Sequence, residues 1–155
     1  MPQLKTGDKA PAFSLRNQQG EAVKLSAFKG RKVLVYFYPK ADTPGCTTQS
    51  CNVRDATPHL SELGVAALGI SPDKPEAQQK FDTKFKLGFP LLADTDHAVA
   101  EAYGVWGEKS MYGKTYFGII RSSFLIDEKG KIAHAWYKVS PDDTVPLAIA
   151  ALKGA

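Results

Sequence analysis

Apolar residues form two nearly unbroken runs in the first half of the chain, Val33–Tyr38 and Val65–Ile70. Runs of this length and composition are typical of strands that are buried on both faces of a sheet. The segment Cys46–Leu63 between them has a helical pattern, although Pro58 predicts a kink or a restart. A strand, a helix and a second strand in this order predict a parallel pair joined by a right-handed crossover.

Shorter elements are predicted on both sides of this unit. Alternating residues around Asn17–Gly20 predict an N-terminal β-hairpin, and Asp127–Gly130 is a typical four-residue loop of a second hairpin. The expected elements are hairpin strands at Ala12–Leu15 with Ala22–Leu25 and at Thr115–Ile126 with Lys131–Val139, one helical turn at Ser26–Gly30, an extended segment at Phe89–Leu92, and helices from Ser71–Glu76 to about Lys86, over Thr95–Tyr103 and over Asp142–Lys153.

This order of elements is that of the thioredoxin fold with an N-terminal hairpin and an inserted segment. Parallel strands followed by an antiparallel hairpin make the sheet mixed. We therefore expect a thioredoxin-like α/β fold, in which helices flank a mixed central sheet. The chain has no internal repeat, low-complexity tract or Gly/Ser-rich linker, so residues 1–155 are expected to form one domain.

Composition narrows the classes of function. The chain has 155 residues and 43% apolar content, enough for a core, but no apolar run long enough to span a membrane and no secretory signal region. The formal net charge of +4 comes from lysines spread along the chain, a pattern that does not favour nucleic-acid binding. We expect a protein of the reducing cytoplasm, where a cysteine pair is more often catalytic, redox-sensing or metal-binding than a permanent disulfide.

The two cysteines, Cys46 and Cys51, follow the first buried strand and open the predicted helix. Unpaired backbone N–H groups and the helix dipole favour a thiolate at such a junction. Thr43, Pro44 and Gly45 stand directly before the first thiol. Proline fixes the chain direction, glycine permits close approach of a small substrate, and the threonine hydroxyl can cap the helix or bind a substrate oxygen.

The spacing of the cysteines limits how they can pair. On a regular α-helix, positions five apart have Cα atoms roughly 8–9 Å from each other and lie on different faces. A disulfide needs Cα atoms within about 7 Å. Either Cys46 and Cys51 never form a disulfide, or the first turns of the helix unwind when they do.

Other interpretations of the two cysteines remain open at this point. A disulfide exchanger of the thioredoxin type would have Cys-x-x-Cys, and a zinc site would need four ligands, whereas His59, His97 and His134 lack ligand spacing. A permanent disulfide conflicts with the expected compartment and with helical geometry. Two buried inert thiols are the remaining alternative, which the Thr-Pro-Gly-Cys context disfavours.

A reactive thiolate at Cys46 predicts chemistry with peroxides. The sulfur would attack one peroxide oxygen and become a sulfenic acid, and the second thiol could then condense with it. A guanidinium suits the polarisation of the O–O bond, because it is always charged and offers fixed donors. Arg121 is the best candidate, since it interrupts the apolar segment Phe117–Ile126, although a strand arginine can also point to solvent; Arg54 is expected at the surface or bridging helices.

These residues resemble those of a known family. The segment Pro39-Lys-Ala-Asp-Thr43-Pro-Gly-Cys46 is similar to the Pro-x-x-x-Thr-x-x-Cys signature of peroxiredoxins. Further segments resemble the bacterioferritin-comigratory, or Q-type, subfamily over nearly the whole chain: Thr47–Cys51, Arg54-Asp55, Leu91–His97, Ala102–Lys109, Met111–Lys114 and Arg121–Asp127.

The resemblance implies a thiol-dependent peroxidase that acts on hydrogen peroxide and organic hydroperoxides. It assigns Cys46 as the peroxidatic cysteine and Cys51 as the resolving cysteine, and it places Thr43 and Arg121 in the active site with Pro39 shielding the sulfur. Pro44 and Gly45 are expected to face the substrate. The implied electron donor is thioredoxin or a glutaredoxin-like dithiol protein, the chain is expected to be a monomer, and no metal or organic cofactor is implied.

Three positions depart from the family pattern. Gln49 stands where peroxiredoxins often have Glu, Asn52 where many relatives have Gly, and Thr83 in the region where some relatives place the resolving cysteine. Two rival functions also remain: a redox sensor that switches through Cys46 and Cys51 without turnover, and an interaction domain with inert thiols.

Overall fold

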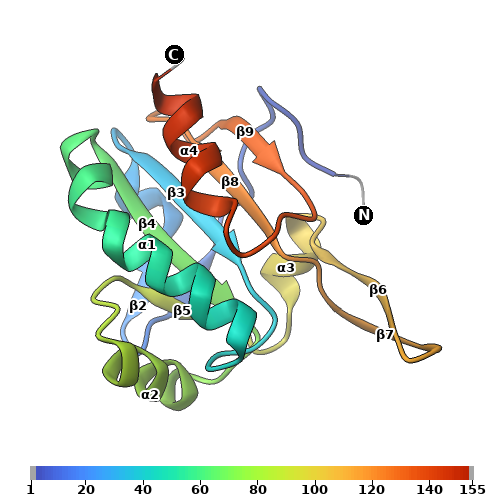
Figure 1. Cartoon of the computed structure of the whole chain (residues 1–155). Helices are drawn as coiled ribbons and strands as arrows, with labels where there is room; N and C mark the ends of the chain where they lie inside the picture. The colour runs from blue at the N-terminus through green and yellow to red at the C-terminus, as the bar shows by residue number, and fades with distance from the viewer. Residues whose placement is uncertain (1–2, 154–155) are drawn as a thin grey trace.

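A seven-stranded mixed sheet forms the centre of the computed structural model, which describes residues 3–153 (Figure 1). The strand order is β2-β1-β5-β4-β3-β8-β9, and β6 and β7 form a separate two-stranded sheet. The elements are β1 Ser14–Arg16, β2 Ala22–Lys24, the 3-10 helix η1 Leu25–Phe28, β3 Lys32–Phe37, α1 Pro44–Glu62, β4 Val65–Ser71, α2 Pro75–Phe85, β5 Leu91–Ala93, α3 Ala98–Ala102, β6 Trp106–Met111, β7 Lys114–Ile119, β8 Ser122–Ile126, β9 Ile132–Trp136 and α4 Thr144–Lys153.

The pairing of the strands confirms the predicted thioredoxin-like α/β fold. β3 and β5 each pair with β4 in parallel, whereas β3–β8, β8–β9 and the N-terminal hairpin β1–β2 are antiparallel. Helix α1 is the crossover between β3 and β4, as the two apolar runs predict. Among residues 3–153, no helix combines the length and the apolar character needed to cross a bilayer.

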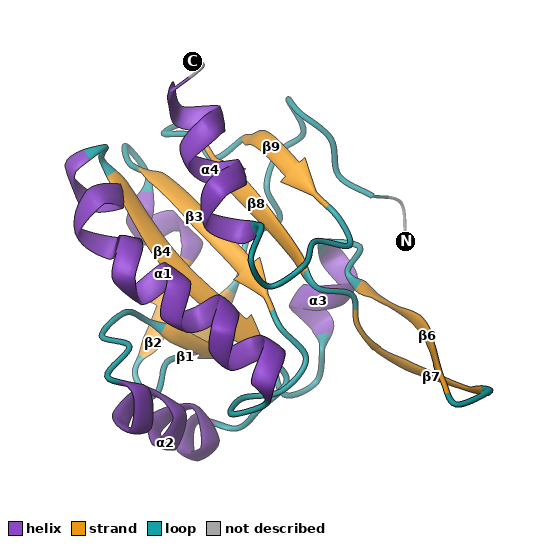
Figure 2. Ribbon diagram, in the orientation of Figure 1, coloured by secondary structure: helices purple, strands orange, loops and turns teal. Residues whose placement is uncertain are grey.

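Helices α1, α2 and α4 cover one face of the main sheet, and the short α3 lies on the other (Figure 2). Side chains on β3 alternate between the faces because the strand repeat is two residues. Leu34 and Tyr36 lie in the clusters beneath α1, α2 and α4, while Val35 and Phe37 pack against α3 and the N-terminal segment. Burial on both faces explains why β3 is apolar at every position after Lys32.

The predicted continuous strand Thr115–Ile126 is wrong, because the chain leaves one sheet and enters another at Ile120 and Arg121. Before this break β7 pairs with β6, and after it β8 pairs with β3. The break is held by backbone bonds, from the Ile120 amide to the Val105 carbonyl at 2.7 Å and from the Val139 amide to the Arg121 carbonyl at 2.9 Å. The β6–β7 hairpin extends away from the main sheet as an arm (Figure 1).

Two predicted helices also differ from the structure. α3 begins at Ala98 rather than Thr95, because His97 adopts a left-handed conformation with φ of 51° and the Asp94 carboxylate accepts bonds from the amides of Val99 and Ala100. Of the predicted kink or restart at Pro58, the restart is wrong, since α1 continues through this residue to Glu62. Proline removes one backbone donor from the helix, and burial of Val53 and Leu60 against the sheet outweighs that loss.

Candidate active site

Cys46 lies in the first turn of α1, directly beyond the carboxyl end of β3. The adjacent loop ends at Thr43, the N-cap residue, and Pro44 occupies the first helical turn, where its missing N–H costs no hydrogen bond. Cys46 is only 1% exposed and packs in the apolar cluster that contains Tyr36 and Tyr38. The predicted strand-to-helix position of the thiol is therefore confirmed.

Arg121 contacts the sulfur from the break between β7 and β8. Its Nη2 lies 3.5 Å from Cys46 Sγ, and its Nη1 donates a 2.6 Å hydrogen bond to Gln49 Oε1. Arg121 is half-buried and its guanidinium contacts Gln49 and Cys46, so the interpretation that it points to solvent is wrong. The guanidinium therefore presents a fixed positive charge and N–H donors directly beside the sulfur.

The fully buried Gln49 connects this arginine to the last helix. Its Nε2 donates a 2.8 Å bond to Thr144 Oγ1 at the start of α4. Both ends of the amide are used, as the acceptor of one bond and the donor of another. A neutral amide thus orients the guanidinium here, where a carboxylate would add a charge close to the sulfur.

Gly45 leaves the space that the guanidinium occupies. A Cβ atom at this position would lie 3.1 Å from Arg121 Nη2 and 3.3 Å from Pro141 Cγ. Such contacts are tighter than ordinary packing allows, so a side chain here would displace one of its neighbours. The approach of a small substrate to Gly45 stays a prediction, and the groups that the structure places against this position are the Arg121 guanidinium and the Pro141 ring.

Thr43 does not cap α1 through its side chain. Its hydroxyl donates a 2.8 Å bond to the Lys40 carbonyl, while its own carbonyl accepts the Thr47 amide. Because the hydroxyl proton is engaged, the lone pairs of Oγ1 are left to accept a proton donor such as the O–H of a hydroperoxide. Pro39 is half-buried in the same loop, and Pro44 is exposed.

Cys51 lies in the same uninterrupted helix as Cys46, and both thiols are free. A regular helix holds their Cα atoms roughly 8–9 Å apart, beyond the reach of a disulfide. Tertiary contacts also hold this part of α1, including Ser50 Oγ to Tyr36 Oη at 2.8 Å and Arg54 Nη1 to the Phe85 carbonyl at 2.8 Å. A Cys46–Cys51 bond therefore requires local unwinding, and Arg54 bridges α1 and α2 as expected.

Tyr36 has no role as a base in this arrangement. Burial is the main cause that raises the pKa of its hydroxyl far above the usual value, and the negative charges of the cysteine sulfurs act in the same direction. The phenol therefore stays protonated and serves as a hydrogen-bonding anchor for α1.

Two residues that orient Arg121, Gln49 and Thr144, were not assigned this role from the sequence. Gln49 had a usable signal, since it stands three residues after Cys46 and shares its helix face. Thr144 had none, because it is 95 positions from Gln49 and meets it only through the packing of α4 on α1. Within residues 3–153, no group of three or more His, Cys, Asp or Glu side chains could hold a metal ion.

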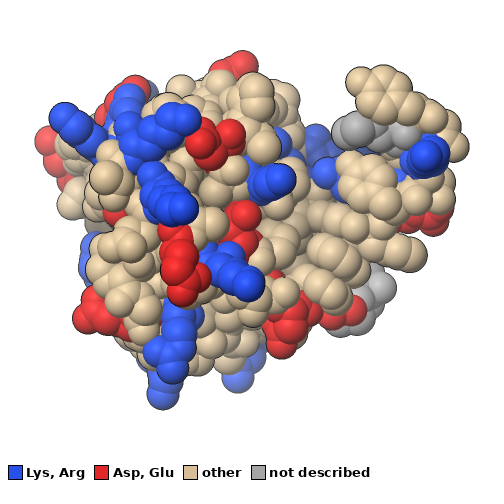
Figure 3. Space-filling model, turned by 90° about the horizontal axis from the view of Figure 1, so that it is seen from below, with Lys and Arg blue, Asp and Glu red and all other residues tan. Residues whose placement is uncertain are grey.

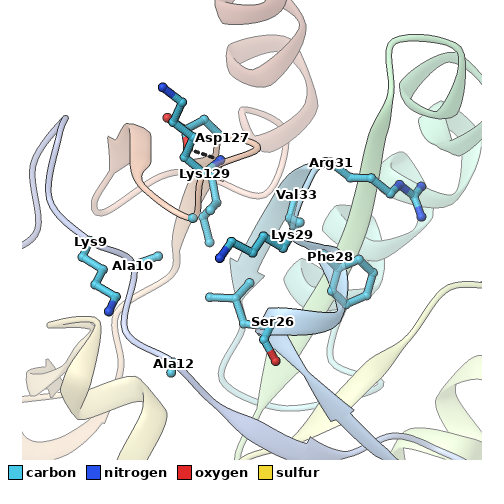
Figure 4. A pocket seen from close by; sticks show the side chains of 13 residues that line it. Lys9, Ala10, Ala12, Ser26, Phe28, Lys29, Arg31, Val33, Asp127 and Lys129 are labelled. Carbon is cyan, nitrogen blue, oxygen red and sulfur yellow. Dashed lines mark hydrogen bonds between the residues drawn. The ribbon is translucent and has the colours of Figure 1, made fainter.

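A separate pocket lies at the other end of β3 and takes no part in this site (Figure 4). Its walls come from the N-terminal segment, η1 and the β8–β9 turn, and they include Ala10, Val33 and Ile126. Lys29 extends across it, while Arg31 points away. On the face shown in Figure 3, basic side chains are interspersed with acidic ones and form no continuous stripe.

Comparisons with known proteins agree with this geometry. The model of the AhpC/TSA family matches residues 6–135. Peroxiredoxin Bcp of Escherichia coli K12 is 59% identical over 149 residues, which cover 95% of this chain and 96% of the relative. The chain belongs to the AhpC/TSA family and is a peroxiredoxin, a thiol-dependent peroxidase.

Solved structures give the same fold. Peroxiredoxin Q of Xanthomonas campestris superposes with a TM-score of 0.89 at 36% identity, covering 96% of this chain and 97% of that one. Peroxidoxin BcpB of Mycobacterium tuberculosis gives 0.86 at 33% identity, covering 97% of each chain. Bacterioferritin comigratory protein of Xanthomonas campestris, whose structure was solved for insight into its alkyl peroxide reduction activity, matches with a TM-score of 0.89 at 35% identity over 96% of this chain and 98% of that one.

Proposed function

We propose that Cys46 is the peroxidatic cysteine of this peroxidase and that Cys51 resolves the oxidised sulfur within the same chain. The observation that carries the proposal is the 3.5 Å contact between Arg121 Nη2 and Cys46 Sγ. A nucleophilic sulfur, a fixed cation beside it and a small glycine next to it are the groups that peroxide reduction needs.

The proposed cycle first oxidises Cys46 with peroxide and then resolves it with Cys51. The Cys46 thiolate attacks one peroxide oxygen, the O–O bond breaks, and the other oxygen leaves as hydroxide or alkoxide and takes up a proton. Arg121 stabilises the negative charge that develops on the oxygens, and Thr43 Oγ1 accepts the hydroperoxide proton in a hydrogen bond. The Cys51 thiolate then attacks the Cys46 sulfenic acid, a disulfide forms, and hydroxide leaves as water after protonation.

A dithiol protein closes the cycle by thiol–disulfide exchange. We assign this role to thioredoxin or a glutaredoxin-like reductant, which donates two electrons and becomes a disulfide itself. Hydrogen peroxide and organic hydroperoxides are the proposed substrates, a choice supported by the alkyl peroxide activity named for the Xanthomonas campestris relative. We further propose that the chain acts as a monomeric, single-domain cytoplasmic enzyme, with Pro39 shielding the sulfur and Pro44 and Gly45 facing the substrate.

Intact mass spectrometry after one equivalent of hydrogen peroxide tests these assignments. The wild-type chain is expected to lose two hydrogens as a disulfide, Cys51→Ser to gain one oxygen, and Cys46→Ser to stay unchanged. Cys46→Ser should also lose peroxide turnover with thioredoxin, because a serine hydroxyl is not ionised at neutral pH. Substantial turnover by Cys46→Ser would refute the assignment, and one stoichiometric oxidation of the wild type without turnover would favour the redox sensor.

A further inference from the structure

Lys109 occupies the strand β6 of the arm, on the face that carries Tyr116 of β7. The two residues are directly opposite each other in the β6–β7 register. Side chains alternate along a strand, so the neighbouring Glu108 projects from the other face of the hairpin. Lys109 is half-buried, whereas Lys114 on the same hairpin is exposed.

Two contacts fix the ammonium group of Lys109. Lys109 Nζ donates a 2.8 Å hydrogen bond to the Ile119 carbonyl, and it lies 5.9 Å from the centre of the Tyr116 ring. Gly118 leaves room for the stem, since a Cβ there would lie 3.4 Å from Lys109 Cδ. Within residues 3–153, no carboxylate lies within 4.0 Å of this ammonium, so its charge is not neutralised by an ion pair.

The charges of the active site act on the pKa of Lys109. Burial is the main cause that lowers the pKa of Lys109, Arg121 lowers it further, and the negative charge of Cys46 raises it. The ammonium is therefore within electrostatic range of both the guanidinium and the sulfur. The hydrogen bond to Ile119 also fixes the backbone two residues before Arg121, at the break between β7 and β8.

We propose that Lys109 is a positioning residue for peroxide reduction: its ammonium adds a second positive charge toward the Cys46 sulfur, and its bond to Ile119 helps to hold the segment that carries Arg121. The inference rests on the proposed role of Cys46. Of the other ionisable groups nearby, Arg121 contacts this sulfur directly, and Tyr36, in the same cluster of side chains as Cys46, stays protonated.

Alkylation of Cys46 separates the charge of Lys109 from a merely structural effect. In the Cys51→Ser background Cys46 is the only thiol, and its rates with anionic iodoacetate and neutral iodoacetamide are compared across pH and salt concentration. Lys109→Met should lower the ratio of the two rates by about threefold, the size expected of one partly solvated charge. It should also weaken the salt dependence of that ratio. Lys109→Arg should restore both, and Lys114→Met is the matched control on the same hairpin.

The outcomes are distinct. An unchanged rate ratio and salt dependence in a folded Lys109→Met variant would overturn the inference, as would equal losses in Lys109→Met and Lys109→Arg. If Lys109→Met does not fold, Lys109→Gln is measured instead, and an unchanged rate ratio and salt dependence in that variant overturn the inference in the same way. A Cys51→Ser chain that gains no oxygen from one equivalent of hydrogen peroxide would instead refute the proposed function, and this inference with it.

Discussion

Arg121 donates a 2.6 Å hydrogen bond to Gln49 although the two residues are 72 positions apart in the chain. The bond joins the break between β7 and β8 to the second turn of α1, and Gln49 extends the connection to Thr144 in α4. Three elements therefore fix one guanidinium beside the Cys46 sulfur. The geometry of the candidate site depends on the packing of the fold as well as on the signature around the cysteine.

Substitution of Arg121 by lysine is expected to slow peroxide reduction by about a hundredfold, although the positive charge is kept. A guanidinium presents donors in a fixed plane and contacts Gln49 and the sulfur together, whereas an ammonium is a single point charge. Stopped-flow measurement of the rate constant for Cys46 oxidation checks this expectation. Arg54→Lys, at a half-buried arginine on α1, is the control, and a similar loss in both variants would count against a specific role for Arg121.

Gln49→Met should destabilise the fold and slow the reaction, whereas Gln49→Glu should preserve the contact with Arg121. Methionine leaves the buried Thr144 hydroxyl and one arm of the guanidinium without their partner, which costs about 1–3 kcal/mol of unfolding free energy. Glutamate still accepts from Arg121, and the Thr144 hydroxyl can turn to donate to it. Urea denaturation and peroxidase assays on the two variants test this, and a fully stable, fully active Gln49→Met would show that the connection is dispensable.

The sequence predicts most of the main sheet, because two strands buried on both faces and a helix between them leave strong local signals. It fails at the arm, where Trp106–Met111 is mostly polar and becomes a strand only by pairing with Lys114–Ile119. For the same reason the sequence predicts one continuous strand over Thr115–Ile126, although the chain changes sheets at Arg121. Pairing partners decide both features, and a local pattern of residues does not contain them.

Site residues that are neighbours in the sequence can be predicted from it, whereas those brought together only by tertiary packing are difficult or impossible to predict. Thr43, Gly45 and Cys46 lie within four consecutive residues where a loop meets α1, so their types and spacing identify this junction. Arg121 is identifiable only because a charged residue is costly within an apolar segment. Thr144 gives no such signal, since a threonine at the start of a helix is ordinary.

Gly45→Ala is expected to separate stability from activity. Alanine normally stabilises a helical position by about 0.5–1 kcal/mol relative to glycine, but here its Cβ would lie 3.1 Å from Arg121 Nη2. Displacement of the guanidinium should lower the rate of Cys46 oxidation by about tenfold while the protein remains folded. Thr48→Ala, an exposed substitution in the same part of α1, is the control. A Gly45→Ala variant with an unchanged rate would show that Arg121 can move without loss of function.

The last prediction concerns the unwinding of α1 when Cys46 and Cys51 form a disulfide. The bond between Ser50 Oγ and Tyr36 Oη holds the helix between the two cysteines. Tyr36→Phe removes this bond and is expected to accelerate disulfide formation by roughly fivefold, the effect of about 1 kcal/mol on a barrier. The rate of the resolution step, followed by rapid quench and mass spectrometry, measures the change.

Tyr38→Phe provides the matched control, because this buried tyrosine lies two residues further along the same face and donates to Gln78 of α2 instead of to α1. Its resolution rate should equal that of the wild type. Amide hydrogen exchange of the oxidised protein should be faster over residues 45–55 than that of the reduced protein, since unwinding exposes these backbone groups. Identical exchange in the two redox states, together with equal rates in the two tyrosine variants, would show that the disulfide forms without opening the helix.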